Sequence, residues 1–174
     1  MDYQTKPTSR KALRALAPIF RELFDVESHG AFPVLEALEK IPIVFKGSSF
    51  NVVDDSKLPP DTPARCQPDD EGNFVIEIKQ SVYDGAYKKN IGAYRGFITH
   101  EMCHVFLYKI GFTPMYNRSF ANNEVPAYCS VEWQTKALCG EVMMPYLDTK
   151  GMDASTIIKK YGVSKGFAEK RQTY

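Results

Sequence analysis

Residues 92–109 read GAYRGFITHEMCHVFLYK, and this stretch decides the fold. Several of its apolar residues recur at the spacing of one helix face, namely Ile98, Met102, Val105 and Phe106. Gly111 follows them, and glycine commonly ends a helix because it adopts a left-handed backbone without strain. The stretch therefore predicts one long helix from about residue 90 to residue 110.

Two of the chain's three histidines lie on this predicted helix, in the sequence His100-Glu101-Met102-Cys103-His104. Residues four apart project from the same helix face, about one turn from each other, so the two imidazoles can bind one tetrahedral zinc ion. Glu101 lies beside the first histidine, where its carboxylate can take a proton from a water molecule on that ion. This is the HExxH pattern of two ligands and a general base, although an ordinary helix with two histidines in the core or at the surface has the same letters.

Gly92 and Gly96 precede His100 at steps of four residues. A glycine inside a helix costs about 1 kcal/mol relative to alanine. We expect the bare helix surface before the site to let a backbone segment or a substrate approach closely.

A catalytic zinc ion needs a third protein ligand and an open coordination position. His29 lies far upstream in a predicted surface turn. The first four acidic residues that follow the motif are Glu124, Glu132, Glu141 and Asp148. We expect Glu132 in the middle of the next helix, where a ligand is held more firmly than at a frayed end. Glu124 is expected near the start of that helix, where an acidic group interacts favourably with the helix dipole. The predicted zinc ligands are therefore His100, His104 and Glu132, with Glu101 as the general base.

The rest of the chain predicts an α+β fold with helices at both ends. Ser9 can cap a helix that contains Pro18 and is either kinked there or divided in two, and Pro33 opens a second helix to about Lys40. Short runs rich in β-branched and aromatic residues predict a small antiparallel sheet of residues 41–45, 50–53 and 74–78. Further helices are predicted over residues 125–144, from the cap Asp153 to Tyr161, and from the cap Ser164 to Arg171.

We expect one domain over residues 1–174, made of N-terminal helices (1–40), a core (41–148) and a basic helix pair (149–174). The chain has 174 residues, 44% of them hydrophobic and 25% charged, with a net charge of +1. This composition excludes a disordered or collagen-like chain, and no apolar run approaches the ~20 residues of a membrane span. The polar N-terminus predicts no secretory signal, and four cysteines without a CxxC spacing predict reduced thiols in a cytoplasmic protein.

The C-terminal segment is basic. Residues 150–174 carry six basic and two acidic side chains, and the two short helices predicted there resemble a helix-turn-helix. Such an end can bind nucleic acid, but basic helix pairs more often present a solvated face while they pack on the body of the protein. We do not expect direct nucleic-acid binding.

The HExxH helix and the later segment from Glu132 to Pro145 together resemble the ImmA/IrrE family of zinc metallopeptidases. That family pairs an HExGH helix with a segment close to ExEANxFAxxLLMP, and Glu132 matches its leading acid, which serves as the third zinc ligand there. The apolar positions that match are Leu138, Val142, Met143, Met144 and Pro145. Residues 161–171 are similar to the closing helix pair. The resemblance follows residues 41–171 in the order of elements, but its specific motifs cover far fewer positions.

The resemblance implies a compact zincin-like metallopeptidase domain, with a small sheet packed on the active-site helix, that cleaves a regulatory protein such as a transcriptional repressor. Three positions depart from the pattern: Cys103 replaces a glycine, Gln134 replaces the second acid, and Lys136 replaces an asparagine or aspartate. Two alternatives therefore stay open, a regulatory binding protein that keeps this fold without proteolysis and a zinc hydrolase acting on a non-peptide bond. The tyrosines that could stabilise an oxyanion are Tyr94, Tyr108, Tyr116 and Tyr128, and the sequence does not choose among them.

Overall fold

The computed structural model describes residues 2–115 and 125–174. Its helices are α1 (Arg10–Leu23), α2 (Val34–Glu39), α3 (Ile41–Val44), α4 (Gln80–Lys88), α5 (Gly92–Lys109), α6 (Val131–Met143), α7 (Tyr146–Thr149), α8 (Ala154–Tyr161) and α9 (Lys165–Arg171). Its strands are β1 (Ser49–Val53), β2 (Ala64–Pro68) and β3 (Phe74–Lys79), and short 3₁₀ turns are η1 (Asp55–Lys57) and η2 (Ala127–Cys129). The fold is thus mixed α+β with a small sheet, as the sequence predicts.

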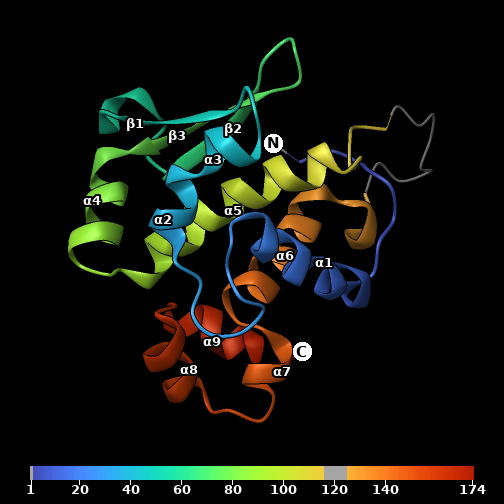
Figure 1. Ribbon diagram of the computed structural model, residues 1–174, viewed down its shortest axis with the longest axis vertical. Coiled ribbons are helices and arrows are strands. Elements are labelled where there is room, and N and C mark those ends of the chain that lie inside the picture. Colours follow the sequence, from blue (N-terminus) through green and yellow to red (C-terminus); the bar gives the residue numbers. More distant parts are fainter. Residues whose placement is uncertain (1, 116–124) are drawn as a thin grey trace.

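Helix α5 runs through the middle of the molecule, with the sheet on one side and α6 on the other (Figure 1). Helix α1 packs against α6, and α7 to α9 form the end of the molecule away from the sheet (Figure 1). The predicted apolar face of α5 is buried, and Phe106 meets Phe20 of α1 edge to face with ring centroids 5.3 Å apart. One continuous apolar cluster extends from Leu13 of α1 to Ala168 of α9. The central helix is therefore held rigidly from both sides.

The sheet differs from the predicted antiparallel one. Its strand order is β1-β3-β2, in which β1 pairs with β3 in parallel and β2 pairs with β3 antiparallel. Strands β1 and β3 match the predicted runs. Strand β2, with the sequence ARCQP, has no β-branched or aromatic residue, follows Pro63 and ends at Pro68. The sequence pattern gave no signal for this strand. Because β2 occupies one side of β3, β1 takes the other side and the sheet is mixed.

The prediction of a strand over residues 41–45 is wrong, since α3 occupies Ile41–Val44. Ile41 and Phe45 are buried whereas Ile43 is 76% exposed, which is the four-residue periodicity of a helix turn. Pro42 lies in the first turn, where its missing N–H leaves no hydrogen bond unmade. A short apolar run fits both periods, and here its packing decides for the helix.

Capping predictions are confirmed at three helices. Ser9, Asp153 and Ser164 each accept a hydrogen bond from the third helical residue that follows, and Gly162 ends α8 with a φ of 62°. Helix α1 continues through Pro18 as one helix. No described helix is long and apolar enough to cross a membrane.

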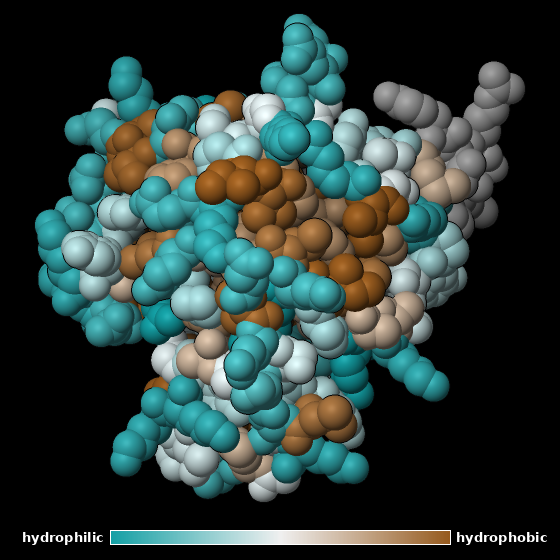
Figure 2. Space-filling view, in the orientation of Figure 1, coloured by the Kyte–Doolittle hydropathy of each residue, from teal (hydrophilic) through white to brown (hydrophobic). Residues whose placement is uncertain are grey.

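Apolar side chains also reach the surface. Figure 2 shows hydrophobic surface across the middle of the face where α1 and α3 lie, and these helices expose Ile19, Leu23 and Ile43. Around α7 to α9 the same face is more hydrophilic (Figure 2).

Candidate metal centre

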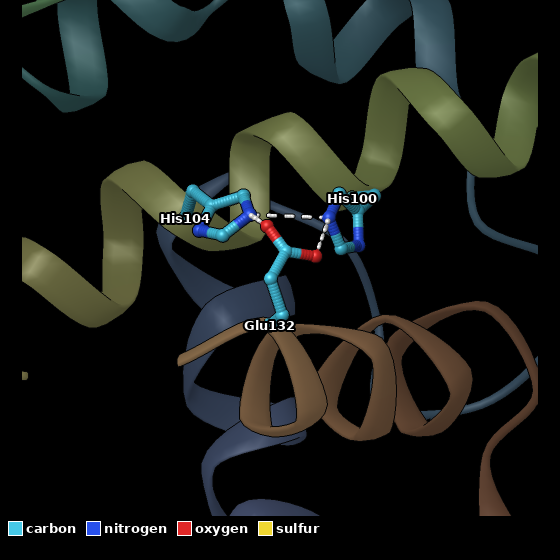
Figure 3. A group of neighbouring side chains, drawn as sticks. All are labelled: His100, His104 and Glu132. Atoms are coloured by element: carbon cyan, nitrogen blue, oxygen red, sulfur yellow. Dashed lines mark hydrogen bonds and ion pairs between the residues drawn. The ribbon is translucent and has the colours of Figure 1, made fainter. Parts of the chain in front are cut away.

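His100, Glu132 and His104 come together between α5 and α6, as predicted. The two histidines descend from neighbouring turns of α5, and Glu132 rises from α6 between their rings (Figure 3). Nε2 of His104 lies 3.1 Å from Nε2 of His100 and 3.1 Å from Oε1 of Glu132. Nε2 of His100 lies 3.4 Å from Oε2 of Glu132. Two imidazole nitrogens and one carboxylate thus converge on one point.

This donor set fits a divalent metal ion. In a tetrahedral zinc site with bonds of about 2.0–2.1 Å, ligand atoms are about 3.3 Å from one another. The three side chains offer ligand atoms that all lie within 4.8 Å of one another, and the nearest approaches of 3.1–3.4 Å match that tetrahedral edge. Three protein ligands leave a fourth position for water or substrate, which is the arrangement of catalytic rather than structural zinc sites.

Glu132 lies in the first turn of α6, not in the middle of a helix as predicted. Helix α6 begins later than expected because Ser130 caps it, its Oγ accepting a hydrogen bond from the Trp133 N–H at 3.1 Å. The Asp2 carboxylate accepts bonds from the Ser130 hydroxyl and from the Glu132 N–H. Glu132 is held firmly for this reason, although it lies near a helix end. Glu124, the rejected candidate, lies outside the described residues.

A buried hydroxyl fixes the orientation of one histidine. Oγ1 of Thr135, one turn after Glu132 and fully buried, lies 3.2 Å from Nδ1 of His104. When Nδ1 carries the proton and donates it to this hydroxyl, Nε2 keeps a lone pair directed at the metal position. Thr135 is a functional candidate that the sequence analysis missed. Its signal was its place three residues after the proposed third ligand.

Glu101 lies beside the three candidate ligands on the same cleft. The backbone N–H of Cys66 in β2 donates a hydrogen bond to its carboxylate. Burial raises the pKa of Glu101 to about 7; the charge of His100 opposes this rise and that of Glu132 adds to it. By contrast, hydrogen bonds with His100 and His104 hold the pKa of Glu132 well below its ordinary value. The two carboxyl groups therefore differ in character, as a ligand and a proton carrier should.

A cleft of about 700 Å³ opens beside the candidate ligands, within the range of small-molecule and peptide sites. His100, Glu101 and Glu132 line it, together with residues of α5, α6 and α9 and the segment before β2. Helix α9, half of the predicted basic helix pair, thus forms one wall of the cleft. Gly92 makes this wall possible, because a Cβ atom there would lie only 2.5 Å from the backbone carbon of Val163.

The structure also brings residues to the cleft that the sequence analysis did not select. These are Arg10, Phe97, Phe167, Lys170 and Tyr174, and beside them lie the already noted Trp133 and Lys136. Of the tyrosines considered for an oxyanion, Tyr94, Tyr108 and Tyr128 do not line the described part of the cleft, and Tyr116 lies outside the described residues. No sequence signal could pair Arg10 with residue 174, because their proximity arises only from the packing of α1 and α9 on α6.

Cys103, which replaces the glycine of the family pattern, points into the core. It is fully buried next to Cys139 of α6, and all four cysteines are free thiols. The thiol therefore acts as a small apolar side chain between the two helices.

The far end of α6 holds a second polar cluster, around Glu141. Its carboxylate is 1% exposed and receives hydrogen bonds from Arg14 of α1 at 3.2 Å and from Arg171 of α9 at 3.0 Å. Arg10 lies 3.7 Å away. This cluster joins α1, α6 and α9 and so sets the position of the cleft wall.

No model of a known protein family matches this chain, and no curated protein matches it significantly.

Proposed function

We propose that this protein is a zinc-dependent endopeptidase, with His100, His104 and Glu132 as the zinc ligands and Glu101 as the general base. The observation that carries the proposal is the convergence of two imidazoles and one carboxylate from two helices on one point, beside a cleft that His100 and Glu132 line. The resemblance of the two motifs to the ImmA/IrrE family supports the same function. The zincin-like identity of the fold is part of the proposal.

The edge of the sheet favours a peptide over another substrate. β2 is an edge strand, and alternate residues of such a strand direct their backbone groups away from the sheet. The Cys66 N–H points to Glu101, whereas the Pro63 carbonyl accepts a bond from the Lys79 N–H inside the sheet. The backbone N–H and C=O of Ala64, which lines the cleft, therefore point away from the sheet, as those of Cys66 do. An extended peptide can pair with this edge beside the general base.

The chain's own residues then divide the chemistry. The edge of β2 aligns the substrate backbone, and Thr135 keeps His104 in the tautomer that binds metal. A bound zinc ion would polarise the scissile carbonyl and lower the pKa of the attacking water. Glu101 accepts the proton of that water and delivers it to the leaving amine. Burial of Glu101 next to the cleft keeps this proton transfer away from bulk solvent.

The rival function is a regulatory binding protein that holds the metal without hydrolysis. Lys136 favours it, since its ammonium lies 3.8 Å from Oε2 of Glu132 and adds a cation next to a metal ligand. The same side chain is 65% exposed and can turn away from the ligand. We therefore keep the peptidase as the first proposal.

The test compares the wild type with Glu101→Gln and with the control His29→Gln. His29 is an exposed histidine paired with Glu27 and lies outside the cleft. We expect one zinc ion per chain in all three proteins, measured by elemental analysis. We expect hydrolysis of fluorescein-labelled casein to fall at least about 100-fold in Glu101→Gln alone. If all three proteins bind zinc and none of them, the wild type included, hydrolyses casein, the result would favour the binding protein.

We also propose that the substrate is a regulatory protein, such as a transcriptional repressor, and that cleavage takes place in the cytoplasm. The four free thiols support a reducing compartment. The cleft wall built from α9 is a reason not to assign the helix pair to DNA.

A further inference from the structure

One wall of the cleft combines cations with aromatic rings. We call it the basic–aromatic wall and define it by Arg10, Trp133, Lys136, Phe167, Lys170 and Tyr174. It comes from α1, α6, α9 and the residues after α9, and it flanks the candidate ligand Glu132. The wall therefore faces the part of a substrate that lies next to the bond to be cleaved.

Positive charge on this wall exceeds negative charge. Glu141 is a single buried carboxylate, but three guanidinium groups surround it, those of Arg10, Arg14 and Arg171. Lys170 has no ion-pair partner among the described residues, and Lys136 shares Glu132 with two imidazoles. Among the described residues that line the cleft, the acidic one outside the metal centre is Asp61. An anionic side chain on the substrate would meet this excess.

Flat apolar surface lies between these cations. Phe167 lies over two glycines of the central helices, since Cβ atoms added to Gly96 and Gly140 would meet its ring at 4.0 and 3.7 Å. The Arg10 guanidinium is 5.9 Å from the Trp133 ring centroid and 3.4 Å from that of Tyr174. Stacking on rings holds this guanidinium at the cleft instead of leaving it free in solvent. Charge and aromatic surface are thus available side by side.

We infer that the basic–aromatic wall selects peptides that carry an aspartate or glutamate next to a large apolar side chain. This inference rests on the proposed function, because it assumes that a peptide occupies the cleft. Cations with aromatic rings also suit single-stranded nucleic acid. A peptide is favoured here because the cleft also reaches Ala64 in the edge strand β2, whose outward backbone groups can pair with an extended chain.

Trp133, the only tryptophan of the chain, reports binding without hydrolysis. The protein for this test is zinc-loaded Glu101→Gln, titrated with acetylated, amidated hexapeptides that contain one Phe-Asp, Asp-Phe, Phe-Asn or Phe-Lys pair among alanines. We expect at least one Asp peptide to change the Trp133 emission and to bind about fivefold or more tightly than the Asn and Lys peptides. The preference should shrink in 0.5 M salt.

Paired variants locate the effect. Lys136→Gln combined with Lys170→Gln removes two charges from the wall and should abolish the Asp preference. Lys159→Gln combined with Lys160→Gln removes two charges from α8, outside the cleft, and should preserve it. Circular dichroism checks that both proteins are folded.

Equal binding of the Asp, Asn and Lys peptides would overturn the inference even when the wild type hydrolyses casein. Tighter binding of a dodecameric oligothymidylate than of any peptide would overturn it as well. An Asp preference that depends on Lys136 and Lys170 supports it, and this result without hydrolysis by the wild type would contradict only the proposed function.

Discussion

Helix α6 carries an acidic side chain near each of its ends, and the two have opposite surroundings. Glu132, in the first turn, lies between two imidazoles, and its side chain is 23% exposed toward the cleft. Glu141, near the last turn, lies among three guanidinium groups and is 1% exposed. Guanidinium is always charged and cannot bind a metal ion, whereas a neutral imidazole offers a lone pair.

This difference indicates that the two carboxylates of α6 have different roles, one in stability and one in metal binding. The Glu141 cluster is closed, since every partner is a permanent cation that joins α1 or α9 to α6. The Glu132 cluster keeps an open side: its two imidazole partners gain a positive charge only by protonation or by binding a cation, and its one permanent cation, Lys136, is 65% exposed. We therefore expect changes at Glu141 to alter stability and changes at Glu132 to alter metal binding.

The largest effect is expected at the closed end. Glu141→Gln leaves the buried guanidinium of Arg171, and the partly exposed ones of Arg10 and Arg14, without their counter-charge. The free energy of unfolding should therefore fall by about 3–5 kcal/mol in urea titrations of the metal-free protein. Glu169→Gln is the control, because Glu169 is 53% exposed in its pair with Lys165 and should matter by less than about 0.5 kcal/mol. Equal stability of the two variants would remove the structural role of Glu141.

At the open end the loss should appear in metal affinity. Glu132→Ala removes one of three ligands, and we expect zinc binding to weaken by more than about 100-fold, beyond the effect of losing an outer contact. Its free energy of unfolding without metal should change by about 1 kcal/mol or less. Competition with a chelating dye measures the affinity. If Glu132→Ala kept its zinc affinity and Glu141→Gln lost it, the roles assigned to the two carboxylates would be wrong.

Substitutions at two glycines of α5 test whether close packing against this helix holds α9 in place beside the cleft. Gly92→Ala places a Cβ atom 2.5–2.7 Å from backbone atoms of the turn before α9, so we expect a loss of about 1–3 kcal/mol in stability. Gly96→Ala meets only the Phe167 ring at 4.0 Å and should be neutral or stabilise the helix by up to about 1 kcal/mol. Thermal unfolding of both variants checks the opposite signs. A stable Gly92→Ala would show that α9 does not need this close approach.

The smallest effect concerns the hydroxyl behind His104. Thr135→Val keeps the shape of the side chain but removes the contact to Nδ1, so zinc affinity should fall about tenfold. Thr99→Val is a matched control on α5, where the hydroxyl donates to the Arg95 carbonyl away from the site. The same affinity in both variants would exclude an orienting role for Thr135.

Local rules predicted much of the helical part and both motif histidines. Caps such as Ser9, Asp153 and Ser164 act on neighbouring N–H groups, so they can be read without knowledge of the fold. The spacing of His100 and His104 likewise depends only on helix geometry. Glu132 does lie against both histidines, as predicted, but its predicted place in the helix was wrong because the cap Ser130 and the upstream Asp2 set the start of α6.

The features that the sequence did not predict depend on contacts between residues far apart in the chain. Strand β2 forms only through its hydrogen bonds with β3, and Ile41–Val44 form a helix because Ile41 and Phe45 are both buried on one side. Glu141 did leave a signal, as a lone acid in the apolar sequence CGEVMMP, although its partners lie more than 100 residues upstream in α1 and 30 residues downstream in α9. The basic–aromatic wall was invisible for the same reason.

The central claim is that two imidazoles and Glu132 bind one zinc ion and leave a corner open. X-ray absorption of the zinc-loaded protein tests it most directly. The account predicts nitrogen and oxygen ligands at about 2.0 Å, including two imidazoles, with a total coordination of four or five. Sulfur ligands at about 2.3 Å, or a spectrum unchanged by Glu132→Ala, would contradict it.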